Sequence, residues 1–63
     1  MEGKFEYTEG DTVRIKTGPF ALFVGKVIEV EHEKATLKVI IRFHNEPKIL
    51  QLGFLDVEKA PAL

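Results

Sequence analysis

Apolar and polar residues alternate with a period of two over much of this chain, a pattern typical of half-buried β-strands. The alternation is clearest over residues 36–43, where one side of the segment is apolar throughout. That side carries Leu37, Val39, Ile41 and Phe43. The opposite side carries Lys38, Ile40 and Arg42. We therefore predict a strand over this segment with its apolar side turned toward a core.

Further strands are predicted where short apolar runs are bounded by Gly, Pro, Asn or charged residues. These segments are 12–16, 26–31, 48–53 and, as a short strand or a 3₁₀ turn followed by a strand, 54–59. Turns are predicted at residues 10–11, 17–19, 32–35 and 44–47, and residues 20–24 form an apolar loop or the start of a strand. We expect Gly10 and Gly18 to adopt positive φ angles, which glycine tolerates without steric cost.

The second predicted strand departs from strict alternation. Val27 and Val30 cannot both face inward in a regular strand, because residues on one face are an even number of positions apart. A β-bulge between Gly25 and Ile28 would reconcile the two valines. Gly25 would also permit a sharp bend or a close approach of another backbone.

A helix over residues 28–43 is the alternative to the second and third strands. The apolar positions there fit a period of two better than 3.6, and β-branched residues are dense, so strands are favoured. Five short strands in 63 residues predict an all-β fold, a small five-stranded barrel, because closure removes exposed sheet edges.

We assign the barrel to residues 10–60 and residues 1–9 to a linker or lead-in segment. The predicted core consists of the apolar residues on the inner sides of the five strands. They are Val13, Ile15, Val27, Val30, Leu37, Val39, Ile41, Leu50, Leu52, Phe54 and Val57.

Composition narrows the class of protein. The chain has no cysteine, so neither disulfides nor a cysteine-ligated zinc ion supports this small core, and a reducing compartment is expected. No apolar run approaches the roughly 20 residues of a membrane span, and the first residues lack the features of a signal peptide. The net charge of −1 argues against non-specific nucleic-acid binding, which requires an excess of Lys and Arg.

No set of residues in the sequence predicts catalysis. His32 and His44 lie in separate turns without a third ligand nearby, which argues against a metal site. The acidic residues lie on turns and outer strand faces, and the glycine spacing does not fit a phosphate-binding loop. We therefore expect a binding domain without catalytic residues, cofactor or metal.

The first half of the chain carries a recognisable motif. It is Gly10-Asp11-x-Val13-Arg14-Ile15-x-x-Gly18-Pro19-Phe20-Ala21-x-Phe23-x-Gly25-x-Val27, which resembles the KOW motif. The form with Gly-Pro-Phe-Ala and a second Phe is similar to the C-terminal domain of NusG-type transcription elongation and antitermination factors. The likeness continues without a gap to Lys59.

The resemblance implies a five-stranded SH3-like barrel in a cytoplasmic, monomeric, membrane-independent factor. In that family a preceding N-terminal domain binds RNA polymerase, and the KOW domain recruits a second protein. The known partners are a small-subunit ribosomal protein, which couples transcription to translation, and the termination factor Rho. The recruiting surface comprises the loop with the two Phe residues and the loop after the third strand.

Carried over to this sequence, the resemblance implies a partner-binding site that includes three residues altered from the family pattern. The predicted site is Phe20, Phe23, Phe43, His44, Asn45 and Glu46. The last three stand where the family usually has Phe-Gly-Arg, which removes an aromatic ring, replaces the turn glycine and reverses a charge. Such a change is expected of a specialised paralogue that serves particular operons, or of a lineage with altered partners.

Several alternatives remain open at this stage. Either loop Phe could close the barrel end, and Ile40 and Ile49 could extend an apolar strip from Phe43 or simply pair across strands. RNA binding, as in ribosomal KOW domains or an antiterminator that recognises an RNA hairpin, would use Arg14, Lys16, Lys26, Arg42 and Lys48. Some NusG relatives switch this domain from a helical hairpin to the barrel, whereas the β-rich segment 28–43 favours a stable barrel here.

Overall fold

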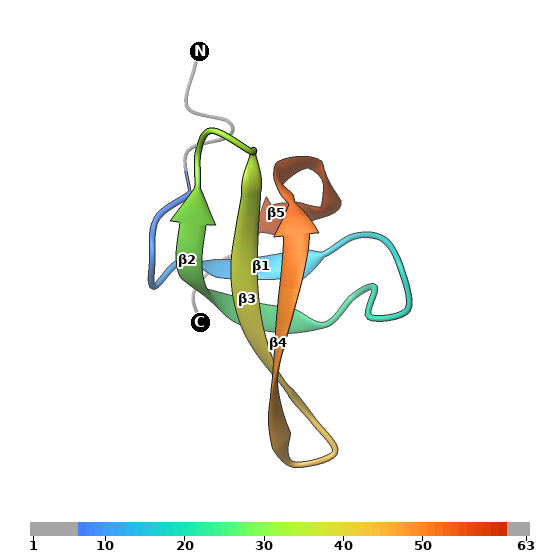
Figure 1. Cartoon of the computed structure of the whole chain (residues 1–63). Coiled ribbons are helices and arrows are strands. Elements are labelled where there is room, and N and C mark those ends of the chain that lie inside the picture. Colours follow the sequence, from blue (N-terminus) through green and yellow to red (C-terminus); the bar gives the residue numbers. More distant parts are fainter. Residues whose placement is uncertain (1–6, 61–63) are drawn as a thin grey trace.

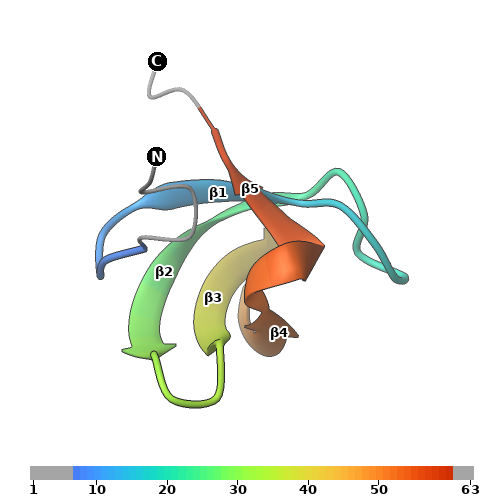
Figure 2. The ribbon, with the colours of Figure 1, turned by 90° about the horizontal axis from the view of Figure 1, so that it is seen from above.

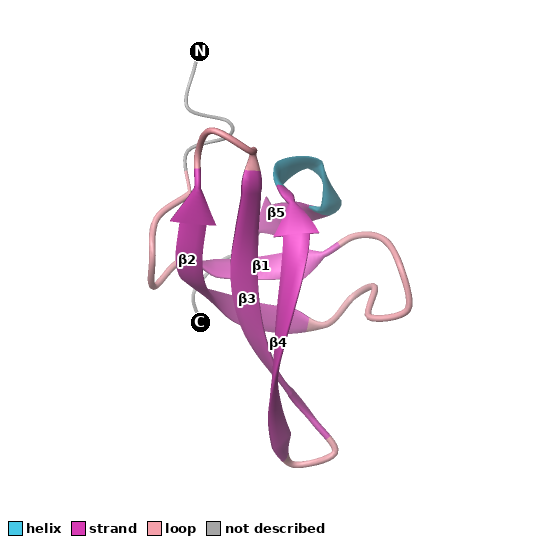
Figure 3. Ribbon diagram, in the orientation of Figure 1, coloured by secondary structure: helices cyan, strands magenta, loops and turns pink. Residues whose placement is uncertain are grey.

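The computed structural model describes residues 7–60, which form five antiparallel strands and one short 3₁₀ helix (Figure 1). The elements are β1 (Thr12–Ile15), β2 (Val24–Glu31), β3 (Thr36–Phe43), β4 (Glu46–Gly53), η1 (Phe54–Asp56) and β5 (Val57–Lys59). The strand order is β4-β3-β2-β1-β5. Among the described residues η1 is the single helical element, as the colouring of Figure 3 makes plain.

The sheet is curved because β2 pairs with β1 at its beginning and with β3 along the rest of its length. The first residues of β2 pair with β1, and from Lys26 onward the strand pairs with β3. As a result β1 runs across the direction of β3 in Figure 1, and β2 and β3 are strongly curved in Figure 2. The predicted class, an all-β five-stranded SH3-like barrel, is confirmed.

The strand boundaries largely follow the prediction. β3 matches it, while β1 ends at Ile15, one residue early. β2 begins at Val24, because Val24 and Gly25 already pair with β1. β4 begins at Glu46, two residues earlier than predicted. The alternation pattern thus locates strand interiors well and strand ends less well.

The predicted four-residue turn 44–47 is too wide. Only His44 and Asn45 form the turn, with φ angles of 55° and 65°, and Glu46 already pairs with Phe43. Two consecutive positive φ angles define a type I′ hairpin, whose twist matches that of the flanking strands. His and Asn are among the residues that adopt positive φ most readily after glycine, so this hairpin forms without the usual Gly.

The predicted bulge is confirmed in β2. The register with β3 shifts between Val27 and Glu29, so that Val27 is buried and Val30 packs against the core. Gly25, two residues before the bulge, is buried beneath β3. A Cβ atom on Gly25 would lie 2.5 Å from the carbonyl oxygen of Ile40 and 2.6 Å from Cγ1 of Val39. The two strands approach this closely only because residue 25 has no side chain.

The predicted core is confirmed, with one addition. Its seven innermost members are buried, and Val30, Leu50, Leu52 and Phe54 pack against them. The addition is Tyr7, whose side chain is buried. Its hydroxyl donates a hydrogen bond to the Val57 carbonyl (3.2 Å), and its ring centroid lies 5.4 Å from that of Phe54. Within the predicted lead-in 1–9, residues 1–6 lie outside the described residues, and Tyr7 is part of the core.

The Gly10–Asp11 turn forms a polar network at the start of β1. Gly10 has a φ of 95°, as expected, and its N–H donates to the Val27 carbonyl over 2.8 Å. The Asp11 carboxylate accepts hydrogen bonds from the Thr8 N–H (3.0 Å) and hydroxyl (3.2 Å), and Lys59 Nζ lies 3.5 Å away. The Thr8 amide hydrogen bond is the main cause that lowers the pKa of Asp11, because it favours the ionised carboxylate.

Replacing Gly25 with alanine is expected to destabilise the barrel, since the new methyl group would collide with the backbone of β3. We expect a loss of about 1–3 kcal/mol in the free energy of unfolding, the usual cost of overpacking. Gly53→Ala is the matched control, because a Cβ there would lie 3.2 Å from the Asp56 carboxylate and 3.9 Å from the Ala35 carbonyl oxygen. Urea denaturation measures both variants, and equal losses would contradict the close-approach account.

The lowered pKa of Asp11 makes its contribution to stability depend on pH. A carboxyl with a depressed folded-state pKa stabilises the fold above its unfolded pKa of about 3.9 and ceases to do so as pH falls through the folded value. Asp11→Ala should therefore cost about 1–2 kcal/mol at neutral pH. The difference from wild type should shrink below about pH 4 in a denaturation series. A difference that stayed constant down to about pH 2 would show that the charge is irrelevant.

Candidate functional site

The loop between β1 and β2 places two phenylalanines against each other. Phe20 and Phe23 are the ends of a four-residue turn, which is closed by a hydrogen bond from the Phe23 N–H to the Phe20 carbonyl (3.1 Å). The third residue of that turn, Leu22, has a φ of 75°, as a type II turn requires. The turn brings the two rings into edge-to-face contact, with centroids 5.7 Å apart.

Backbone hydrogen bonds connect this loop to β1 and to η1. The Leu22 N–H donates to the Ile15 carbonyl (2.7 Å), and the Ile15 N–H donates to the Phe23 carbonyl (2.9 Å). At the other side of the loop the Lys16 N–H donates to the Asp56 carbonyl (2.7 Å). The Thr17 hydroxyl lies 3.1 Å from the Asp56 carboxylate. The loop is therefore an extension of the sheet, anchored on η1.

Phe43, at the end of β3, completes a group of three rings. Its centroid lies 5.4 Å from that of Phe20 and 5.8 Å from that of Phe23. We call these three residues the aromatic cluster. All three side chains are half-buried and pack against the core, so each ring covers part of the barrel end and leaves part of its surface in contact with solvent. Phe20 and Phe23 therefore do both things that were considered for them: they close the end of the barrel, and they leave part of each ring exposed.

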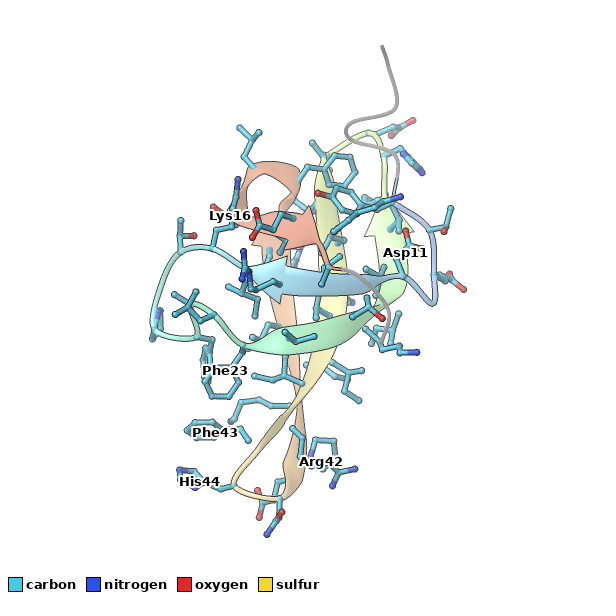
Figure 4. All side chains as sticks on the ribbon, turned by 180° about the vertical axis from the view of Figure 1, so that it is seen from behind. Asp11, Lys16, Phe23, Arg42, Phe43 and His44 are labelled. Atoms are coloured by element: carbon cyan, nitrogen blue, oxygen red, sulfur yellow. The ribbon has the colours of Figure 1, made fainter. Side chains whose placement is uncertain are left out.

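His44 extends the cluster toward the tip of the β3–β4 hairpin. Its ring centroid lies 4.2 Å from that of Phe43, and Figure 4 shows Phe23, Phe43 and His44 following one another along the same side of the molecule. Asn45 and Glu46 are exposed at the tip. Of the six predicted site residues, four are therefore in one contiguous group and two lie beside it. Their role in binding stays a prediction.

The five basic residues considered for RNA binding do not form one surface. Arg14, Lys26 and Arg42 lie on the outer face of the sheet, and Figure 4 shows Arg42 directed away from Phe43. Lys48 is paired with the buried Ile41 and so lies on the opposite face, which is also that of Phe43. Lys16 is exposed in the loop after β1, where its N–H donates to the Asp56 carbonyl. Arg14 is also engaged in an ion pair with Glu58, its Nε lying 2.8 Å from the carboxylate.

Ile40 and Ile49 are direct cross-strand partners on the outer face. Strand alternation puts them on the side opposite to Phe43, so they do not continue the aromatic cluster. The interpretation as ordinary cross-strand pairing is the one that the register supports.

Leu22 is not among the predicted site residues, although it is 72% exposed between the two phenylalanines of the loop. The sequence pattern predicts only an apolar segment there. The available signal was a leucine at the third position of a Phe-x-x-Phe turn, where the φ angle calls for Gly or Asn.

Among residues 7–60, no three His, Cys, Asp or Glu side chains gather as metal ligands. The same residues contain no helix long and apolar enough to cross a membrane. The aromatic cluster and the adjoining hairpin tip are therefore the candidate functional site of the described residues.

Comparison with known proteins relates this arrangement to one family. Residues 9–42 match the KOW motif family. The transcription termination/antitermination protein NusG of Escherichia coli K12 is 43% identical over 54 residues, which cover 86% of this chain and 30% of that protein. NusG of Haemophilus influenzae is 44% identical over 54 residues, which cover 86% of this chain and 29% of that protein.

A solved structure described as "Domain interaction in Thermotoga maritima NusG" superposes with a TM-score of 0.81 at 33% identity. The match covers 87% of this chain and 31% of that one. The chain thus spans about 30% of the length of the NusG proteins it matches. On the motif, the identity and the shared fold, this chain belongs to the KOW motif family and is a KOW domain of the NusG type.

Proposed function

We propose that this chain is the protein-binding module of a NusG-like transcription factor and that it binds its partner through the aromatic cluster and the β3–β4 hairpin tip. In this proposal another domain of the factor binds RNA polymerase in the cytoplasm. The module recruits a small-subunit ribosomal protein or Rho to it, the partners implied by the family resemblance. It performs no chemistry of its own.

The observation that carries the proposal is the aromatic cluster itself. Three phenylalanines from two segments about 20 residues apart meet at one end of the barrel, half-buried and in ring-to-ring contact. Aromatic side chains dominate the binding energy of protein interfaces. Because the loop is already anchored to β1 and η1, little conformational entropy is lost when a partner covers it.

The hairpin tip supports a modified version of the family's binding mode. Glu46 is exposed beside Phe43 at the position where the resemblance implies an arginine. A partner that offers an acidic group to that arginine would be repelled by Glu46, at a cost that can reach several kcal/mol. The proposed partner affinity is therefore lower than that of a domain with the family tip.

RNA binding is less well supported than protein binding. Arg14, Lys26 and Arg42 lie on the outer face, and Arg14 is already paired with Glu58. Lys48 lies on the opposite face, and Lys16 lies in the loop after β1. A net charge of −1 further weakens the attraction to phosphates. Of the four candidate basic residues that lie in strands, only Lys48 shares the face of Phe43 in the β3–β4 register, so these residues place little positive charge beside the cluster to guide a single strand onto it.

Titration calorimetry of alanine variants with the ribosomal protein and with Rho tests the proposal. Phe23→Ala and Phe43→Ala should each weaken binding by about 1–3 kcal/mol, the loss typical of an interface hot spot. Ile49→Ala is the control, since Ile49 is 58% exposed on the outer face. A ¹⁵N correlation spectrum of each variant verifies folding. Unchanged affinities for both partners would contradict the proposal, as would RNA binding that is steeply salt-dependent and indifferent to the Phe variants.

The altered tip leads to a second prediction. The double variant His44→Phe, Glu46→Arg should bind the ribosomal protein about tenfold more tightly than wild type, because it restores an aromatic contact and removes a charge repulsion. Glu33→Arg, which makes the same charge change in the exposed β2–β3 loop, should leave the affinity unchanged. An equal gain from Glu33→Arg would mean that net charge, and not the hairpin tip, governs binding.

A further inference from the structure

Leu22 combines two features that are unfavourable in the isolated domain. It is 72% exposed, which is the largest exposed fraction of any large hydrophobic residue between positions 7 and 60. Its φ angle of 75° lies in the left-handed region, where the Cβ atom of a bulky residue crowds the backbone. Neither burial nor backbone preference therefore explains a leucine at this position.

The turn would form more readily with another residue at position 22. The hydrogen bond from the Phe23 N–H to the Phe20 carbonyl makes Leu22 the third residue of a turn whose φ requirement Gly or Asn meets at lower cost. Strained residues of this kind are found mainly at functional sites, where the side chain is needed for another purpose.

The position of Leu22 indicates that purpose. It lies between two members of the aromatic cluster along the chain, and its own N–H is bonded to the Ile15 carbonyl over 2.7 Å. Its backbone belongs to the same hydrogen-bonded turn as the two phenylalanines. A protein that covers Phe20 and Phe23 therefore comes close to Leu22.

We propose that Leu22 is a partner-contact residue that extends the apolar surface of the aromatic cluster, and that the protein partner receives it in an apolar depression. The inference rests on the proposed function, because it assumes that the cluster binds a protein. It adds a specificity element: a partner that presents a charged or polar group opposite Leu22 is rejected, since that group would lose its water without gaining a hydrogen bond.

The test uses a variant that should improve the fold and impair binding. Leu22→Asn suits the left-handed conformation, so its melting temperature should equal or exceed that of wild type. Its dissociation constant for the ribosomal protein should rise about five- to thirtyfold, as expected for losing a buried leucine contact. Ile49→Asn is the matched control: Ile49 is 58% exposed on the outer face, opposite to Phe43, and its replacement should leave the dissociation constant unchanged.

The outcomes separate this inference from the proposed function. If Phe43→Ala weakens binding and Leu22→Asn does not, the inference is overturned and the proposed function stands. If neither variant matters, the proposed function fails and the inference fails with it. A marked fall in the melting temperature of Leu22→Asn would overturn the inference by giving the side chain a structural role.

Two further measurements complete the test. Intermolecular NOEs from the Leu22 methyl groups of the wild-type domain to the ribosomal protein are expected, and their absence from an assigned complex overturns the proposal without any mutation. Sedimentation of the free domain should give a monomer. A dimer that dissociates on Leu22→Asn would instead assign the leucine to contact with a second copy of this chain and overturn the proposal.

Discussion

The close approach of β2 to β3 at Gly25 is the constraint on which the rest of this barrel depends. A side chain at residue 25 would meet the Ile40 carbonyl and the Val39 side chain, so the strands could not approach as they do. Two residues later the bulge turns Val30 back toward the core. Together these features bend β2 enough to pair with β1 at one end and β3 at the other. A flat sheet of this size could not enclose a core.

The same bend determines where the candidate site lies. Because β2 crosses from one half of the sheet to the other, the loop before it comes to rest beside the end of β3, where Phe43 lies. Hydrogen bonds also stabilise the two ends of β1. Before the strand, the Asp11 carboxylate accepts a hydrogen bond from the Thr8 N–H. After the strand, the Asp56 carbonyl accepts a hydrogen bond from the Lys16 N–H. The loop that carries Phe20 and Phe23 is therefore hydrogen-bonded to the rest of the domain, which would reduce the conformational entropy lost in the proposed binding.

Stability and binding make opposite demands on the loop of residues 16–23. The backbone is hydrogen-bonded to β1 and η1, yet it carries an exposed leucine with a positive φ and two phenylalanine rings that are only half-buried. A small domain has little core to offset such costs, since it buries only about 60% of the surface of its unfolded chain. Apolar groups left partly exposed under these conditions support the proposed binding of a partner at this surface.

The sequence by itself determined the strands, the bulge and the inner face of each strand, because these follow from a period-two pattern within a few neighbouring residues. It also indicated Phe20, Phe23 and Phe43 by resemblance to a family. Only the tertiary structure decided that these rings touch, that Tyr7 completes the core and that the basic residues are divided between two faces. Contacts between distant residues depend on the curvature of the sheet and on the register of its strands. The bulge and the two-residue hairpin set both, and no local sequence pattern specifies their combined effect.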